Sequence, residues 1–512
     1  MSKKSFLMKS LVPLSIAGLL LTGCTGGGSS TDSGAGGDTS AAADTLRANW
    51  GSFPENWAPG VANEPGYVRV PYETLVNRDE AGEILPNLAT EWELNDDGSE
   101  LTLTLRDDVT FHDGTPFNAD AVVANFDYIA NTVGGEYGGP LKVQVASVEA
   151  IDDTHAKFVF TQRNPQFISV LSQLNMPIGS PAAIADGSIE TRPVGTGPWQ
   201  FDEATSVAGT TASFVQYADY WGELPAFENI ELYGVTDDNS IAAGILNGEF
   251  DVADTEPDVA SMYDGAANAE YFNYPAIRNN ITFFDRGPGG QFEDPQVREA
   301  LCLAMDNEAV AALSDGTAQS QHFIEGEVFF NPSIEAKDGH LDEALALWEE
   351  LGNPAINAEI SVAPFTKNET SQRAEQMNQL PNVNITVQEF PPPQWSGNWN
   401  SGQFALGLGQ HSQITPSSWY STWWAAGAGA NPAGVESDEL KALADEALQA
   451  SEDEAPEKWQ AVMQQVADES LACSHYAGTE MIAFNTDAVT DVQPFLYWEP
   501  KQIDYRAIKP AN

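Results

Sequence analysis

Basic residues are scarce in this chain of 512 residues. Lysine and arginine together number 22 against 75 aspartates and glutamates, so the formal net charge at pH 7 is −53. A surface with this charge repels polyanions, which argues against nucleic acid as a partner. Hydrophobic residues make up 42% of the sequence and aromatic residues 10%. Since disordered acidic chains are poor in both, the composition indicates a folded globular protein, and the length suggests about three domains.

Histidine and cysteine are also scarce, and the common spacings of metal ligands are missing. The six histidines include no pair three to five residues apart, and neither H-E-x-x-H nor C-x-x-C occurs. G-x-S-x-G and a P-loop are absent too, and Gly195-Thr196-Gly197 continues to Gln200, where a dinucleotide fingerprint has a third glycine. The sequence therefore predicts no metal site, no cofactor, and no nucleotide or acyl-transfer chemistry.

Adjacent acids are the remaining candidates for enzymatic chemistry. Pairs such as Asp152-Asp153 and Asp237-Asp238 have the residue types that a glycosidase uses. In a chain with 75 acids, however, such pairs arise freely, and a role in turns is the simpler interpretation. We expect a protein that is not an enzyme, with a secreted lipoprotein hydrolase as the alternative from another functional class.

The N-terminal segment has the pattern of an export signal. Three lysines precede the apolar run 11–21, which is too short to span a bilayer but has the length of a signal-peptide core. The run ends in Leu21-Thr22-Gly23-Cys24, which resembles the lipobox of bacterial lipoproteins and implies a lipid on Cys24. Residues 24–45 contain only small and polar types together with cysteine, and predict a flexible tether. We therefore expect a signal peptide over 1–23 and an extracytoplasmic protein that its lipid anchors to the bacterial cell membrane.

Two further features follow from this expected processing. Removal of residues 1–23 takes away three lysines and no acid, so 19 of the 22 basic residues remain and the body becomes more acidic. This charge suits a salty medium, and simple solubility is an equal alternative. With Cys24 lipidated, Cys302 and Cys473 remain as an even pair in an oxidising compartment, which predicts one disulfide.

Strand and helix patterns alternate along the chain. Leu101, Leu103 and Leu105 alternate with threonines, which is typical of a half-buried strand. Asn118 is the expected cap of a helix, and Asp294-Pro295 predicts the start of another, on which Cys302 lies. No internal repeat is present. The pattern indicates an α/β protein.

Several segments, in this order, resemble landmarks of the extracytoplasmic solute-binding proteins of ABC importers, in the peptide/nickel-binding family 5. The resemblance covers nearly the whole expected mature chain. The segments are Tyr72-Glu73-Thr74-Leu75-Val76, residues 85–92, 97–98 and 105–106, Phe111-His112-Asp113-Gly114-Thr115-Pro116-Phe117-Asn118-Ala119-Asp120, Val194-Gly195-Thr196-Gly197-Pro198-Trp199, Tyr220-Trp221-Gly222, Gly248-Glu249-Phe250-Asp251-Val252, residues 294–301, and Ala304-Met305-Asp306. We interpret His112 as a hydrogen-bonded loop residue of this pattern rather than a metal ligand.

The resemblance implies a two-lobe periplasmic-binding-protein-like fold (type II, cluster C-like) with an extra inserted domain. The expected first lobe combines residues 46–66, 187–278 and 485–512, the extra domain spans 67–186, and the second lobe spans 279–484. Such lobes close on a solute by a hinge motion, and the permease and ATPase complex recognises the closed form. The protein is expected to act as a monomer. A sensor or chaperone-like lipoprotein with the same fold is an open alternative.

The resemblance also suggests where a solute binds. In relatives the cleft is lined by the loop after the first strand and by loops of the second lobe, and aromatic rings there can stack on a solute. The corresponding candidates here are Asn49, Trp50, Trp57, Gln410, His411 and Trp419.

The expected ligand is a peptide, although the usual anchoring acid is missing. Peptide-binding relatives hold the ammonium group with an aspartate in the loop that here reads Gln410-His411-Ser412-Gln413-Ile414-Thr415-Pro416. Asp285 is the expected substitute. An oligosaccharide is the next alternative, and a metal chelate held through His411 is the last.

Overall fold

The computed structural model describes residues 44–50, 56–60, 66–78, 83–133, 141–325, 329–411, 415–451, 453–493 and 503–511. The expected signal peptide, Cys24 and nearly all of the expected tether lie outside these residues. Among the residues described, no helix is both long and apolar enough to cross a membrane.

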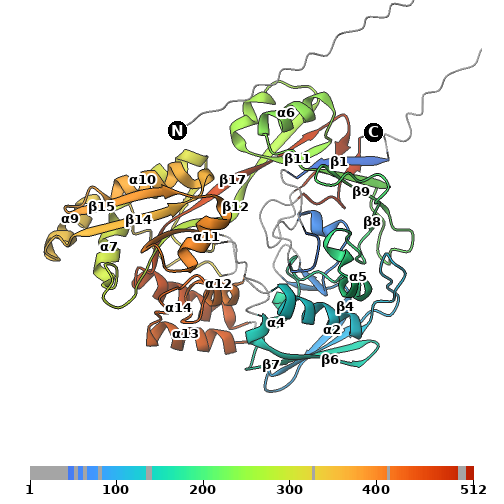
Figure 1. Cartoon of the computed structure of the whole chain (residues 1–512), viewed down its shortest axis with the longest axis horizontal. Helices are drawn as coiled ribbons and strands as arrows, with labels where there is room; N and C mark the ends of the chain where they lie inside the picture. Colours follow the sequence, from blue (N-terminus) through green and yellow to red (C-terminus); the bar gives the residue numbers. More distant parts are fainter. Residues whose placement is uncertain are drawn as a thin grey trace, which may run out of the picture. The chain divides into compact units, whose positions relative to one another are not determined.

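Eleven of the described strands form one large sheet (Figure 1). Its order is β15-β14-β16-β12-β17-β11-β1-β10-β9-β8, and β13 pairs with β17 beside this path. We call β1 with β8 to β11 the first half of the sheet, and β14 to β16 the second half. The strands are β1 (Thr45–Asn49), β8 (Trp199–Phe201), β9 (Thr211–Gln216), β10 (Asn229–Tyr233), β11 (Val252–Thr255), β12 (Ala269–Phe284), β13 (Thr317–Gln319), β14 (Ile356–Val362), β15 (Val383–Glu389), β16 (Leu406–His411) and β17 (Ala472–Asn485).

β12 and β17 are the longest described strands, and they connect the two halves. They pair antiparallel over residues 269–283 and 472–485. At one end β17 also pairs with β11 of the first half, and at the other end β12 pairs with β16 of the second half. The register is interrupted between Pro275 and Asn279 and again before Thr282. Because an interrupted ladder bends and twists locally, the two halves meet at a natural bending point.

A second sheet, β4-β5-β7-β6, lies in the segment expected to form the extra domain. In β5, Leu101, Leu103 and Leu105 are buried and the residues between them are half-buried, which confirms the predicted alternation. Asn118 Oδ1 accepts the Ala121 N–H at 3.1 Å, which confirms the predicted helix cap. The elements are β4 (Ala89–Leu94), β5 (Glu100–Leu105), α2 (Ala119–Tyr128), β6 (Val145–Asp152), β7 (His155–Phe160), α4 (Phe167–Val170) and α5 (Pro181–Asp186), preceded by the pair β2 (Val76–Arg78) and β3 (Ile84–Pro86).

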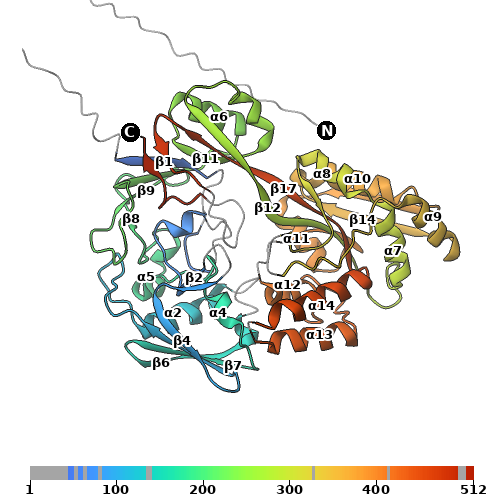
Figure 2. The ribbon, with the colours of Figure 1, turned by 180° about the vertical axis from the view of Figure 1, so that it is seen from behind.

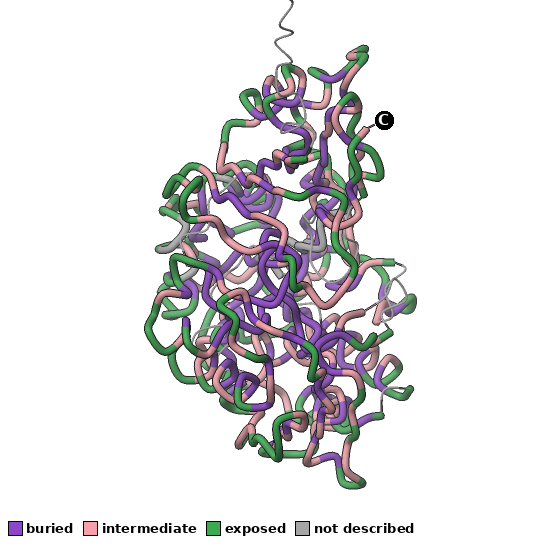
Figure 3. Tube along the Cα trace, turned by 90° about the vertical axis from the view of Figure 1, so that its right-hand side faces the viewer, coloured by how far each residue is buried: buried purple, intermediate pink, exposed green. Residues whose placement is uncertain are grey.

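The hydrophobic cores differ in how local they are. In one core all of the buried members lie between residues 75 and 178. The core of the first half combines residues from 46–72, 183–274 and 482–508, so it is assembled from pieces far apart in sequence. Buried residues concentrate toward the middle of the molecule, and exposed residues lie mostly along its outline (Figure 3). The exact domain boundaries expected from the sequence stay a prediction.

Helices flank the second half on two sides (Figures 1 and 2). α9 and α10 belong to the core that contains β14 and β15, and α13 and α14 pack against each other. These helices are α7 (Pro295–Ala304), α8 (Asn307–Ala311), α9 (Leu341–Glu350), α10 (Lys367–Met377), α11 (Pro392–Asn400), α12 (Pro416–Trp423), α13 (Asp438–Gln449) and α14 (Ala455–Asp468), whereas α6 (Asp238–Asn247) lies with the first half.

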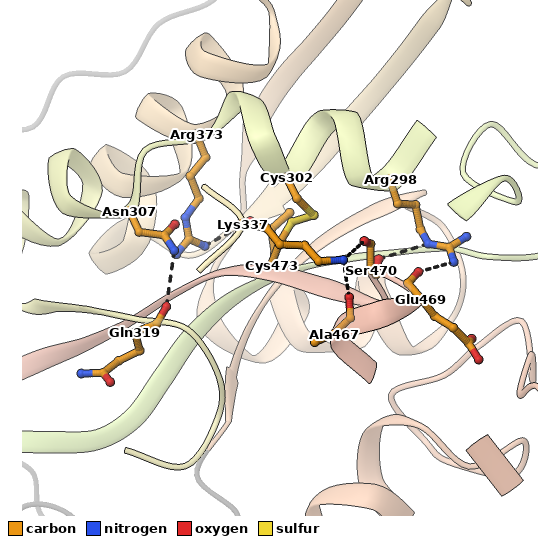
Figure 4. The surroundings of a disulfide bond; sticks show 11 residues. Arg298, Cys302, Asn307, Gln319, Lys337, Arg373, Ala467, Glu469, Ser470 and Cys473 are labelled. Atoms are coloured by element: carbon orange, nitrogen blue, oxygen red, sulfur yellow. Dashed lines mark hydrogen bonds between the residues drawn. A yellow bond between two sulfur atoms is a disulfide. The ribbon is translucent and has the colours of Figure 1, made fainter. Parts of the chain in front are cut away.

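A disulfide joins Cys302 on α7 to Cys473 on β17, the pair that the sequence predicts (Figure 4). The two Cα atoms are 5.6 Å apart, and 171 positions separate the residues. In the chain-entropy account, closing a loop of this length removes about 5 kcal/mol of conformational freedom from the unfolded chain. The disulfide therefore ties the first helix after β12 to the strand that returns beside β12.

Arg298 is a second link between α7 and the segment before β17 (Figure 4). Its side chain is buried, and it donates hydrogen bonds to the carbonyl oxygens of Phe292, Glu293, Glu469 and Ser470. The last two residues follow the end of α14, where helix carbonyls lack partners in the helix. A charged donor at this position stabilises both the helix end and the turn before α7.

His112 is a hydrogen-bonded loop residue, as expected. Its Nε2 lies 2.9 Å from the carbonyl oxygen of Gly197, and its Nδ1 accepts the Gly195 N–H at 3.4 Å. A carbonyl must receive a proton and an N–H must give one, so this geometry requires the neutral ring with its proton on Nε2. Burial lowers the pKa of His112 to about 4.

We predict that His112 makes the protein less stable in mild acid. An unfolded histidine titrates near pH 6.5, so between about pH 6.5 and 4 this histidine is protonated in the unfolded chain and neutral in the folded protein. The free energy of unfolding should therefore fall as the pH drops through this window. Between pH 7 and 5, urea unfolding should show a loss about 1–2 kcal/mol smaller in His112→Gln than in the wild type. His155→Gln, which changes a partly exposed histidine, is the control, and equal pH slopes for His112→Gln and the wild type would contradict the assignment.

Candidate functional site

Three parallel strands of the first half end at the same edge of the sheet. β1 lies between β10 and β11 and is parallel to both. Open α/β sheets bind their ligands at the carboxyl ends of such strands. Asn49 is the last residue of β1, and its register neighbours are Tyr233 and Ala253. The edge formed by the ends of β1, β10 and β11 is therefore the first candidate site.

Asn49 supports this edge with its side chain. It is fully buried, its Nδ2 donates to the carbonyl oxygen of Val235 at 3.0 Å, and its Oδ1 accepts the Val235 N–H at 2.8 Å. Both ends of the amide are thus bonded to the segment that follows β10. This geometry gives Asn49 a role in fixing the edge of the sheet.

Trp50 and Trp57 meet at a third ring, Tyr67. The ring centroids of Trp50 and Trp57 lie 6.1 and 5.0 Å from that of Tyr67, in edge-to-face geometry. The three side chains are between 3% and 6% exposed. A Cβ atom on Gly66 would lie 2.5 Å from the Trp50 ring, so only glycine allows this close approach. The structure thus brings Asn49, Trp50 and Trp57 together at one edge.

Two buried acids lie at the same edge, each next to apolar residues of its strand. Asp254 on β11 and Glu480 on β17 are 6% and 5% exposed. Tyr274 on β12 is opposite Glu480 in the register, and its hydroxyl donates to Asp254 Oδ2 at 3.4 Å. Burial, and after it the two carboxylates, raise the pKa of Tyr274 well above its ordinary value. Burial and the Asp254 charge likewise raise the pKa of Tyr505. Negative charge is therefore concentrated near the bending point of β12 and β17.

Sequence reasoning missed these acids, although a signal for them exists. Asp254 follows Val252 and Ala253, and Glu480 precedes Met481, Ile482 and Ala483. A carboxylate inside an apolar strand is unusual, because aspartate and glutamate are rarely buried without a specific reason. That criterion selects few of the 75 acids.

The candidates on β16 and Asp285 lie at opposite ends of one strand pair. His411 is opposite Asn279 in the β12–β16 register, close to the bending point, whereas Asp285 follows the last paired residue, Phe284. Six residues of extended chain separate the two ends, which corresponds to about 20 Å. Asp285 Oδ1 accepts the Gly287 N–H at 2.9 Å. The side chains of Gln410 and His411 are outside the described part of the chain.

Trp419 lies in the core of the second half. It is 2% exposed, and its ring stacks on His322 with a centroid distance of 5.7 Å and an interplanar angle of 14°. It also lines a cavity of about 40 Å³, together with residues that include His475 and Cys473. Burial lowers the pKa of His475 to about 3, so this ring is neutral. The cavity has room for a few water molecules, far less than a peptide needs.

No group of three or more histidine, cysteine, aspartate or glutamate side chains among the described residues is arranged to hold a metal ion. The groups at the edge of the first half that could contact a solute are aromatic rings, an amide and carboxylates.

We predict that Asn49→Ala lowers the free energy of unfolding by about 1–2 kcal/mol, since it removes the partner of two part-buried backbone groups of Val235. Urea unfolding measures the loss, and Asn229→Ala, at the start of β10, is the control. If Asn49→Ala were as stable as the control, its main contact would be with a solute instead.

Comparison with known proteins places this geometry in a family. Residues 83–432 match the family model described as bacterial extracellular solute-binding proteins, family 5. The glutathione-binding protein GsiB of Escherichia coli (strain K12) is 32% identical over 255 residues, which are 48% of this chain and 48% of that protein. The corresponding protein of Shigella flexneri is 31% identical with the same coverage. The chain thus spans about half the length of the curated relatives that it matches.

Solved structures show the same fold. HbpA2 from Haemophilus parasuis has a TM-score of 0.77 at 20% identity, covering 91% of this chain and all of that chain. A dipeptide-binding protein from Pseudoalteromonas sp. SM9913, in complex with Met-Leu, has a TM-score of 0.76 at 19% identity, with the same coverage. The predicted α/β two-lobe, periplasmic-binding-protein-like fold is confirmed. The chain belongs to the bacterial extracellular solute-binding proteins of family 5.

Proposed function

We propose that the protein is the solute-binding component of an ABC importer, which captures a solute outside the cytoplasm and presents it to a membrane permease and its ATPase. Family membership over residues 83–432 is the observation that carries this proposal. The interrupted β12–β17 pair supports it, because two halves joined at a bending point can close around a solute and open again. Binding of this kind makes and breaks no covalent bond.

A peptide is the proposed solute. Glutathione is the ligand in the name of the GsiB relatives, and peptides are bound in the structures of the Pseudoalteromonas protein and of DppA from Helicobacter pylori. Asp254 and Glu480 support the proposal, since a peptide carries an ammonium group that buried carboxylates attract. A metal chelate is the second candidate, because NikA from Brucella suis binds Fe(III)-EDTA on the same fold. An oligosaccharide is the third candidate, and only the tryptophans at the site support it.

The proposed position of the solute is the edge where β1 and β11 end. Trp50 and Trp57 lie at this edge, and β16 brings Gln410 and His411 toward the same bending point. Asp254 and Glu480 supply charge there, whereas Asp285 is about 20 Å away along the sheet.

Mass spectrometry of small molecules released by denaturing gently purified protein tests the proposed function. We expect peptides of two to a few residues, in amounts close to one per chain. Release of a chelated metal or of sugars would contradict the peptide proposal and favour the metal chelate or the oligosaccharide as the solute. Turnover of added peptides or glycosides by the purified protein would contradict the binding role and favour the hydrolase alternative.

Titration with glutathione and with Met-Leu tests the proposed position. Glu480→Gln removes one buried negative charge with little change in shape, and we expect it to weaken peptide binding about tenfold or more. Glu249→Gln, which changes an exposed acid between α6 and β11, is the matched control. Equal affinities for both variants and the wild type would move the ammonium site elsewhere.

A lipid on Cys24 is the proposed anchor, supported by Leu21-Thr22-Gly23-Cys24 and by the small-residue segment after it. The wild-type protein should fractionate with membranes and yield an acylated N-terminal peptide, whereas Cys24→Ala should be released into the medium. A soluble wild-type protein with an unmodified N-terminus would contradict the anchor.

A further inference from the structure

At the end of helix α13 the Ala450 N–H donates to the carbonyl oxygen of Ala447 at 3.3 Å. Ala450 is in an extended conformation, and the last turn of the helix has no basic residue. The last carbonyl groups of a helix lack partners within the helix, and the aligned peptide dipoles give this end partial negative charge. Donors from elsewhere are therefore expected at the end of α13.

These donors come from the segment between β7 and α4, which belongs to the extra sheet. Gln166 Nε2 donates to the carbonyl oxygen of Ala447 at 2.6 Å, and Arg163 Nε donates to that of Gln449 at 3.0 Å. The other end of the Gln166 amide accepts the indole N–H of Trp459 on α14 at 2.9 Å, and Trp459 is fully buried. Both ribbon views place α4 beside α13 (Figures 1 and 2).

The segment that carries the two donors is held in place by hydrogen bonds to neighbouring parts of the extra sheet. The Asn164 N–H donates to the carbonyl oxygen of Gly98 at 2.9 Å, and Asn164 Nδ2 donates to Gln144 Oε1 at 3.0 Å. Gly98 has a φ of 69°, and a Cβ atom there would lie 2.9 Å from Arg163 Cγ. The turn at Gly98 thus leaves room for the arginine stem and holds the segment in place.

The extra sheet is joined to the first half by contacts on both sides of it in the sequence. Glu73, just before the extra sheet, forms a part-buried ion pair of 2.8 Å with Arg506, and His112 is bonded to Gly195 and Gly197. The chain reaches the second half only through β12 and returns through β17. Bonds from Arg163 and Gln166 to α13 therefore form only when the two halves come together.

We propose that Arg163 and Gln166 are positioning residues that hold the two halves closed from outside the solute site, by capping α13. We call these two residues with Trp459 the clasp. The inference rests on the proposed function, because a clasp matters to binding only if closure traps a solute. The apparent affinity of such a protein scales with the fraction of molecules able to close, so contacts remote from the solute contribute to the dissociation constant.

Hydrogen–deuterium exchange of the full protein as purified tests the clasp without any added solute. Gln166→Met keeps the length of the side chain and removes both hydrogen bonds. We expect exchange in the last turn of α13 and the first turn of α14 to become at least threefold faster. Gln464→Met is the matched control, since Gln464 lies on α14 and bonds only within that helix, to Asp468. Unchanged exchange in Gln166→Met would overturn the proposal.

Binding kinetics with glutathione as the probe give the second readout. Gln166→Met should raise the dissociation rate about five- to fiftyfold and leave the association rate nearly unchanged, since the bonds form after encounter. Trp459→Phe removes the indole donor, and its effect should be less than additive with Gln166→Met. Additive effects, or a change confined to the association rate, would overturn the clasp.

The two readouts separate the clasp from the proposed function. If glutathione and other peptides fail to bind while exchange responds to Gln166→Met, the peptide proposal fails and the clasp stands. If glutathione binds equally well to the wild type, Gln166→Met and the control, the proposed function stands and the clasp fails.

Discussion

The antiparallel pairing of β12 and β17 is the constraint on which the rest of the structure depends. These two strands run through both halves of the sheet, so the first half, the second half and the disulfide are all positioned relative to one ladder. The ladder is interrupted near its middle, between Pro275 and Asn279. A continuous ladder would couple the halves rigidly, whereas an interrupted one keeps their alignment and lets their angle change.

The few basic residues are used where they connect distant segments. Arg298 joins the start of α7 to the end of α14, and Arg506 joins the end of the chain to Glu73. Arg373 is fully buried, bonds to Thr282 on β12, and lies 5.0 Å from the ring of Tyr476 on β17. Burial lowers the pKa of Arg373 to about 10, which still leaves it charged. Other basic residues, such as Lys441 and Lys458, form exposed ion pairs with nearby acids.

The sequence was sufficient where a feature depends on neighbouring residues. The alternation of β5 and the cap at Asn118 are local patterns, and both are confirmed. The disulfide could be predicted by counting, since only Cys302 and Cys473 remain after the lipobox cysteine.

Features that depend on distant partners could not be predicted in the same way. Asn49 lies at the expected edge, but the hydrogen bonds between its side chain and the Val235 backbone depend on a strand pairing across 186 positions. Asp285 was expected to substitute for the missing anchoring acid, and its distance from His411 depends on how far β12 continues past its bending point, which the sequence does not fix. The burial of Trp419 depends on His322 and Phe323, which no periodicity connects to it.

The assembly of the first half from separated pieces has a consequence for the order of folding. The core whose buried residues lie between 75 and 178 is mostly local, with Val194 and Trp221 packed against it, whereas the first-half core includes Ile503, Tyr505 and Ile508 beside residues such as Leu46. Contacts across more than 400 positions close slowly, because loop-closure entropy is lost before they form. The extra sheet can therefore fold early, whereas the first-half core stays incomplete during the interval before residues 482–508 join it. That interval, rather than the finished protein, is where chaperones would be needed.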